Sequence, residues 1–259
     1  MTQRELAALD AYQLLPRALH DVANPDMTAA VLGLTLAAPI VPRRRRGDAL
    51  ASGQLAALPA EAVLADIERH PAGHTVAVLP PRAMSELVGQ VKRLAARGVA
   101  AVGLDLAPLA DTAPFGTEEW RPRTREDLAE LRAAAGCPLW LFGVASAADA
   151  EVAAEAGAEA VVVSGGLGAH VAAPPVIELL PEIVDATGGM LTIASGGPVR
   201  DGLDVLRYLA VGAEIVVMEG DRDPVDIAAE LAYAMRLTAC ANLGDIGYDL
   251  LFAPAFEEP

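Results

Sequence analysis

The sequence predicts an α/β barrel, in which parallel strands form the core and helices cover them. Three short apolar runs, Ala160–Ser164, Leu191–Ser195 and Glu214–Met218, each lead into a glycine within two residues. The segments between them carry apolar residues at helical spacing, so the order is strand, helix, strand, helix, strand. Strands that are apolar along their whole length are buried on both faces, as in a parallel sheet covered by helices. With 259 residues, the chain is long enough for one such barrel.

Composition and charge exclude several classes of protein. A formal net charge of −16 argues against a nucleic-acid partner, because phosphate backbones attract basic surfaces. No apolar run approaches the about 20 residues that a membrane span needs, and the first residues show no signal-peptide pattern, so we expect a cytoplasmic protein. Cys137 and Cys240 are too few and too far apart for a disulfide scaffold or a zinc site, and we expect no metal.

The segment from Pro16 to Pro42 contains a Pro-Arg-x-Leu-x-Asp-Val run, then Asp-Met-Thr, Val-Leu-Gly and Pro-Ile. This combination resembles the N-terminal signature of the FMN-dependent α-hydroxy-acid oxidases and dehydrogenases, the family of glycolate oxidase, lactate oxidase and mandelate dehydrogenase. The resemblance implies an eight-stranded barrel, FMN as the cofactor, oxidation of a 2-hydroxy acid, and oligomers formed through barrel faces. The matching residues are Pro16, Arg17, Leu19, Asp21, Val22, Asp26, Met27, Thr28, Val31, Leu32, Gly33, Pro39 and Ile40.

The resemblance covers almost the whole chain and gives the order of the elements. We expect a helix over Arg4–Leu15 that stops at Pro16, an N-terminal extension over 1–33, a barrel over 34–236 and a C-terminal tail over 237–259, all in one domain. The first five strands are then predicted at Pro39–Pro42, Gln54–Leu58, Thr75–Leu79, Ala101–Leu106 and Pro138–Phe142. Helices are predicted at Ala49–Gly53, Ala60–His70, Ser85–Arg97 and Arg125–Ala135.

The residues that carry the chemistry of the resembled family are replaced in this chain. The resemblance implies a histidine base and a carboxylate-binding arginine after the sixth strand, and here Gly166 and Ala169 stand at those positions. On the fifth strand, Phe142 replaces the lysine that stabilises the reduced flavin. Glycine cannot accept a proton, so the family reaction loses its base.

The phosphate side of the resembled site is partly kept. Ser164, Ser195, Gly196, Gly197 and Arg200 form a residual FMN-phosphate loop by this resemblance, with Arg200 able to face an anion. After the eighth strand, Glu219 stands where the family has a glycine of a Gly-Arg pair. A carboxylate there would repel a phosphate by an energy on the order of a few kcal/mol. FMN is therefore implied by resemblance, but we expect it to bind weakly or not at all.

Other polar residues at the strand ends are candidates for altered chemistry. His170 either replaces the lost base or is a solvent-exposed loop residue, and Asp105 and Glu219 are further candidate catalytic groups. The run of Arg43, Arg44, Arg45 and Arg46 directly follows the first strand. Four adjacent cations there either bind an anionic ligand or an acidic partner surface, or form a solvated loop.

The sequence is compatible with two functions. In the first, the chain is a degenerate family member that is inactive by itself and acts as a structural or regulatory subunit, in a homo-oligomer or with an intact homologue. In the second, it is an enzyme with altered chemistry, either an FMN-dependent oxidoreductase on a 2-hydroxy acid or a flavin-free lyase, isomerase or cyclase. Replacement of polar site residues by apolar ones would suit an apolar substrate in this second case.

Overall fold

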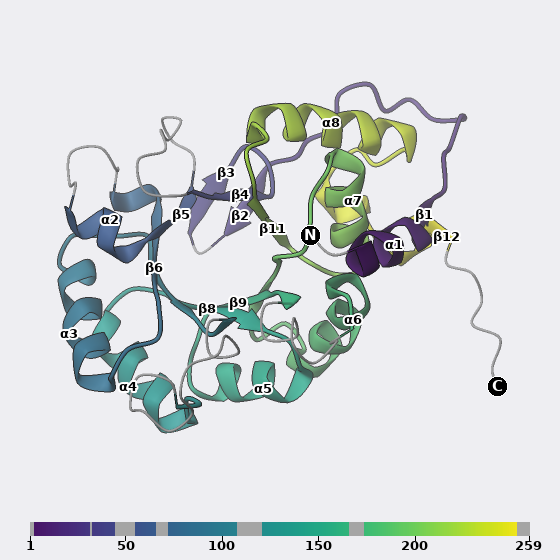
Figure 1. Cartoon of the computed structure of the whole chain (residues 1–259). Coiled ribbons are helices and arrows are strands. Elements are labelled where there is room, and N and C mark those ends of the chain that lie inside the picture. Colours follow the sequence, from purple (N-terminus) through teal and green to yellow (C-terminus); the bar gives the residue numbers. More distant parts are fainter. Residues whose placement is uncertain are drawn as a thin grey trace, which may run out of the picture.

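A computed structural model describes residues 3–31, 33–44, 55–65, 72–107, 121–165 and 174–252. Eight parallel strands close into a barrel in the order β10-β11-β4-β5-β6-β7-β8-β9. Each strand pairs with its neighbour in the chain, and the last, β11, pairs with the first, β4. Figure 1 shows the helices around the outside of the strands. The predicted (β/α)8 barrel with a short N-terminal helix is therefore confirmed.

The barrel strands lie within two residues of every predicted position. Each is buried along most of its length, because helices cover its outer face and side chains fill the interior. Their bounds are β4 Ile40–Arg43, β5 Ala56–Pro59, β6 Thr75–Leu79, β7 Ala101–Asp105, β8 Leu139–Val144, β9 Ala160–Val163, β10 Thr192–Ser195 and β11 Ile215–Glu219.

The covering helices follow the strands in alternation. Helix α4 coincides with the predicted Arg125–Ala135 helix; it begins with a capping box between Thr124 and Asp127 and ends at Gly136, whose φ is 61°. The predicted helix at 49–53, and residues 66–70 of another, lie outside the described residues. The helices are α2 Ala60–Ala65, α3 Met84–Ala95, α4 Arg125–Ala135, α5 Ala147–Glu155, α6 Val176–Thr187, α7 Gly202–Ala210 and α8 Pro224–Leu237, with short 3-10 turns at Ala72–His74, Leu243–Asp245 and Tyr248–Leu250.

Two aromatic rings from one strand fill much of the barrel interior. Trp140 and Phe142 on β8 are buried, and their ring centroids lie 6.2 Å apart. The strands around them contribute small side chains, and at Gly103 a Cβ atom would lie 2.7 Å from Phe142 Cε2. A chain with few aromatic residues thus fills its lumen by pairing two rings with small neighbours. Those neighbours include Ala57, Ala101, Ala160 and Ala194.

The N-terminal segment differs from the prediction. The helix expected over Arg4–Leu15 ends earlier, as α1 Gln3–Ala11, so the prediction was wrong for its last residues. Instead, β1 Gln13–Leu14 pairs antiparallel with β12 Leu251–Phe252, near the other end of the chain. The backbone N–H of Leu15 also donates to Leu250 at 2.8 Å. Tertiary pairing with a distant strand therefore overrides the local helical pattern.

A β-hairpin that the sequence pattern did not reveal closes the amino end of the barrel. It consists of β2 Ala29–Val31 and β3 Leu34–Leu36, with Gly33 at a φ of 81° in the turn. A positive φ of this size favours glycine. Its buried side chains pack in the same apolar cluster as Trp140 and the interior of the barrel. The hairpin leads directly into β4, so it covers the end of the barrel opposite the carboxyl ends of the strands.

Candidate functional site

Three charged side chains meet at the carboxyl end of the barrel. Arg43, Asp105 and Glu219 are the last residues of β4, β7 and β11. Side chains alternate between the two faces of a strand, and Val41 and Val217, two residues earlier, pack inside the barrel. The three charged residues therefore continue the inward-facing rows, in the part of a barrel where catalytic groups usually lie. We call these three residues the mouth cluster.

Arg43 connects the mouth cluster into one network. Its Nη2 pairs with Asp105 Oδ2, and its Nη1 donates to Glu219 Oε1 at 3.0 Å. The guanidinium carbon also lies 5.3 Å from the centre of the Phe142 ring, which gives a cation–π contact. Asp105 is 8% exposed, and its second oxygen accepts from the backbone N–H of Ala107 at 3.0 Å. The positive charge thus contacts two carboxylates and an aromatic face, and the Arg43 side chain remains 30% exposed.

The backbone donors of the loop after β10 are used inside the protein. Gly196 N–H donates to the Val163 carbonyl at 2.7 Å, and Gly197 N–H donates to Ser195 Oγ at 3.2 Å. A Cβ atom at Gly197 would lie 2.2 Å from the Tyr208 hydroxyl oxygen, so the ring covers this part of the loop. Burial raises the pKa of Tyr208 further above neutral pH. These glycines therefore present neither N–H to an external anion.

Arg200 is held by carboxylates of the chain itself. Its Nε and Nη2 donate to the buried Asp204, each at 2.8 Å, and its Nη2 and Nη1 donate to Asp10 at 2.6 and 3.1 Å. Arg207 Nη1 donates to Asp204 as well, at 2.8 Å. The hydrogen bonds that Arg200 donates, first to Asp204 and then to Asp10, raise the pKa of Arg200. The sequence predicts that Arg200 faces an anion, and in the structure the anions it meets are Asp204 and Asp10.

The remaining predicted site residues are placed as follows. Ser164 is half-buried at the end of β9, and its N–H donates to the Val144 carbonyl at 3.2 Å. Arg44 is half-buried, and its N–H donates to the Ala57 carbonyl at 2.9 Å, next to the mouth cluster. Arg45, Arg46 and His170, together with positions 166 and 169, lie outside the described residues.

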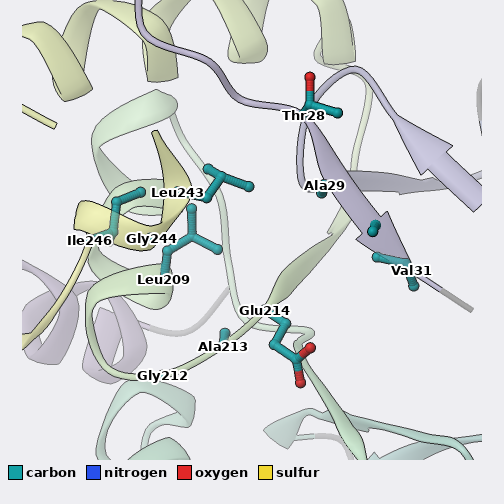
Figure 2. A pocket seen from close by; sticks show the side chains of 11 residues that line it. Thr28, Ala29, Val31, Leu209, Gly212, Ala213, Glu214, Leu243, Gly244 and Ile246 are labelled. Carbon is teal, nitrogen blue, oxygen red and sulfur yellow. The ribbon is translucent and has the colours of Figure 1, made fainter. Parts of the chain in front are cut away.

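A groove of about 440 Å³ lies at the opposite end of the barrel (Figure 2). The hairpin strand β2, the end of α7 and the turn at Leu243–Asp245 surround it, and Glu214 supplies a carboxylate. Its lining residues are Thr28, Ala29, Ala30, Val31, Leu209, Gly212, Ala213, Glu214, Leu243, Gly244 and Ile246.

Across the described ranges, no three His, Cys, Asp or Glu side chains are grouped to hold a metal ion. Within the same ranges, no helix is both long and apolar enough to cross a membrane.

Comparison with known proteins decides the family. The model of the FMN-dependent dehydrogenase family matches residues 59–220, which is more than half of the chain. The chain belongs to the FMN-dependent dehydrogenase family. This confirms the family that the N-terminal signature resembles, through residues that lie after that signature.

Several characterised relatives match part of the chain. An L-lactate oxidase from Lactobacillus jensenii is 33% identical over 135 residues, which cover 46% of this chain and 33% of the relative. A 4-hydroxymandelate oxidase from Amycolatopsis orientalis is 34% identical over 141 residues, covering 49% and 40%. An L-lactate dehydrogenase from Caulobacter vibrioides is 43% identical over 140 residues, covering 48% and 37%. The matched segments thus span well under half the length of these relatives.

Solved structures share the fold over nearly the whole chain. A flavocytochrome b2 variant superposes with a TM-score of 0.79 at 22% identity, covering 99% of this chain and 81% of that one. A mandelate oxidase gives a TM-score of 0.72 at 21% identity, covering 93% and 86%.

The described residues do not fit the cofactor for which the family is named. A flavin phosphate needs free N–H groups and a free guanidinium, and here Gly196, Gly197 and Arg200 already have partners within the chain. On the ring side, the Phe142 ring faces a guanidinium that two carboxylates hold. Binding FMN in the family position would require both sets of contacts to break.

Proposed function

We propose that this chain is a non-catalytic member of the FMN-dependent dehydrogenase family, located in the cytoplasm, which acts as a structural or regulatory subunit alongside an intact homologue. The observation that carries the proposal is the mouth cluster. Arg43 lies on Phe142 and pairs with Asp105 and Glu219, at the end of the barrel where family members carry out their reaction.

The contacts of Asp105 support the loss of catalysis. A general base needs an oxygen that can reach the substrate proton. Both oxygens of Asp105 already accept hydrogen bonds, one from Arg43 and one from Ala107. Glu219 is more exposed, but it pairs with the same guanidinium. The two carboxylates therefore balance the charge of Arg43, and both are engaged in an ion-pair network at the carboxyl end of the barrel.

The subunit role follows from what the fold retains. The described residues retain the eight barrel strands and the helices α2 to α8, and the sequence retains the N-terminal signature. The chain therefore keeps the framework that carries the surfaces through which barrels of this family pair with each other. If a chain loses the reaction but keeps the fold, its surface can still bind a partner protein. This favours a role as a structural or regulatory subunit.

The test begins with the purified chain. We expect a colourless protein, with no flavin absorbance and no oxidation of 2-hydroxy acids when FMN is added. Co-expression with an intact homologue from the same organism should yield a stable mixed complex by size-exclusion chromatography with light scattering. The flavin content should then match the homologue alone.

Three results would overturn the proposal. Stoichiometric FMN in the chain purified alone would refute the closed site. Failure to assemble with any intact homologue, with the chain remaining a monomer, would refute the subunit role. Turnover of a substrate without flavin, lost in Asp105→Asn and kept in the surface control Asp185→Asn, would replace the proposal with a flavin-free enzyme.

A further inference from the structure

The N-terminal helix α1 brings its two acidic side chains to the carboxyl end of the barrel. Glu5 Oε2 accepts the backbone N–H of Val176, the first residue of α6, at 3.2 Å. Asp10 accepts two hydrogen bonds from Arg200, at 2.6 and 3.1 Å. Figure 1 shows α1 beside α6 and α7, the helices that follow the sixth and seventh barrel strands. We call Glu5 and Asp10 the α1 carboxylates.

Both contacts are of the kind that an external anion makes. The first N–H groups of a helix have no partner within it and carry partial positive charge, so an anion is favoured there. The planar guanidinium of Arg200 offers a fork of donors that matches the two oxygens of a carboxylate or phosphate. Asp10 uses that fork with both of its oxygens. The chain thus supplies its own anions to two donor groups on the same rim.

Local structure fits the docking of Glu5 closely. A Cβ atom at Gly165, directly after β9, would lie 3.0 Å from Glu5 Oε1, so the missing side chain leaves room for the carboxylate. Burial raises the pKa of Glu5, and the hydrogen bond from Val176 opposes that rise. A half-buried carboxylate in this position costs desolvation free energy, which the α6 N–H offsets only in part.

The rest of α1 fixes the two carboxylates in place. Leu9 is fully buried in the apolar layer between the barrel and its helices. The carbonyl of Tyr12, just after the helix, accepts from Arg207 Nε at 2.8 Å.

We propose that α1 is a built-in anionic cover, whose carboxylates take the place of an external phosphate group on the rim formed after the sixth and seventh strands. The cover is an intramolecular contact that competes with any phosphate-bearing molecule for Arg200 and the N-terminus of α6. This goes beyond the proposed function, because it concerns the segments after β9 and β10 and none of the three residues of the mouth cluster, and it does not depend on whether catalysis is lost.

The test replaces the α1 carboxylates with uncharged amides of nearly the same size. We compare wild type, the double variant Glu5→Gln/Asp10→Asn, and the control Glu182→Gln/Asp185→Asn, which neutralises two exposed carboxylates on α6. Inorganic phosphate is the probe, with ionic strength held constant by chloride. Its affinity is measured by calorimetric titration and by the phosphate dependence of the melting temperature. Adding Arg200→Met to the double variant tests the donor.

We expect phosphate to bind the double variant at least tenfold more tightly than wild type or the control, and Arg200→Met to abolish that gain. Equal affinities in all three proteins would overturn the proposal, as would a gain that survives Arg200→Met. If the double variant does not fold, Asp10→Asn alone, at an exposed position, gives the same comparison. Binding of FMN to the double variant would count against the proposed function while supporting the cover, so the two failures are distinguishable.

Discussion

The ion pair between Arg43 and Asp105 gives the sharpest quantitative prediction. Arg43→Met keeps most of the side-chain length but leaves the carboxylate of Asp105, whose side chain taken alone is 12% exposed, without its cation. Uncompensated charges at buried positions cost about 3–5 kcal/mol. Because Arg43 itself is 30% exposed and Ala107 still donates to Asp105, we expect about 2–3 kcal/mol of destabilisation.

The complementary change should cost less. Asp105→Asn leaves Arg43 paired with Glu219 and stacked on Phe142, so we expect about 1 kcal/mol. In the double variant the unpaired carboxylate is absent, and the losses should not add. The expected coupling energy is about 1.5 kcal/mol.

Urea unfolding of the four proteins at neutral pH measures this coupling. The exposed pair of Arg125 and Glu155, 3.2 Å apart, provides a matched cycle for which we expect less than about 0.5 kcal/mol. A coupling at the mouth no larger than in this surface pair would refute the reasoning. It would mean that Arg43 does not close the mouth in solution, and the proposed function would lose its main support.

Two further predictions concern stability away from the mouth. Hydrogen bonds from Arg121 lower the pKa of Asp127 to about 2, so its stabilising contribution is present above the unfolded-state pKa near 4 and is lost as pH falls from about 4 to about 2. Arg121→Met should remove much of that acid sensitivity; parallel acid unfolding curves for the two proteins would contradict this. At Gly202, a Cβ atom would lie 2.1 Å from the Leu231 backbone nitrogen, so Gly202→Ala should destabilise by about 3 kcal/mol. At Gly89 in α3, an added Cβ atom would have no other atom within 4 Å, so Gly89→Ala should stabilise the protein by about 0.5–1 kcal/mol. Thermal melts in which both substitutions shift the melting temperature in the same direction would contradict this reasoning.

The sequence predicts the barrel well because each strand carries its signal locally. A run such as Thr75–Leu79 is apolar on both faces, and β6 has those bounds. The strand pair β1 and β12 carries no such signal, since two residues at each end of the chain meet only when the barrel is complete. The same limit hides the hairpin of β2 and β3, whose three-residue strands are too short for a recognisable period.

The sequence predicts which residues lie at the candidate site, but not which of them contact each other. Strand ends alone place Asp105 and Glu219 at the mouth, and the Arg43 run directly after a strand is visible in the sequence. That Arg43 reaches Asp105 depends on closure of the barrel, which brings together residues 62 positions apart. The contact of Asp10 with Arg200 spans 190 positions, and no local pattern marks Asp10 as a partner.

The packing of Phe142 ties together three positions on three different strands. Its ring occupies space that the missing side chain of Gly103 leaves open, and its face carries the guanidinium of Arg43. A lysine at 142 would leave a void beside Gly103 and set two cations against each other. The three positions therefore depend on one another: a side chain at Gly103 would collide with the Phe142 ring, and loss of that ring would remove both the filling beside Gly103 and the aromatic face beneath Arg43.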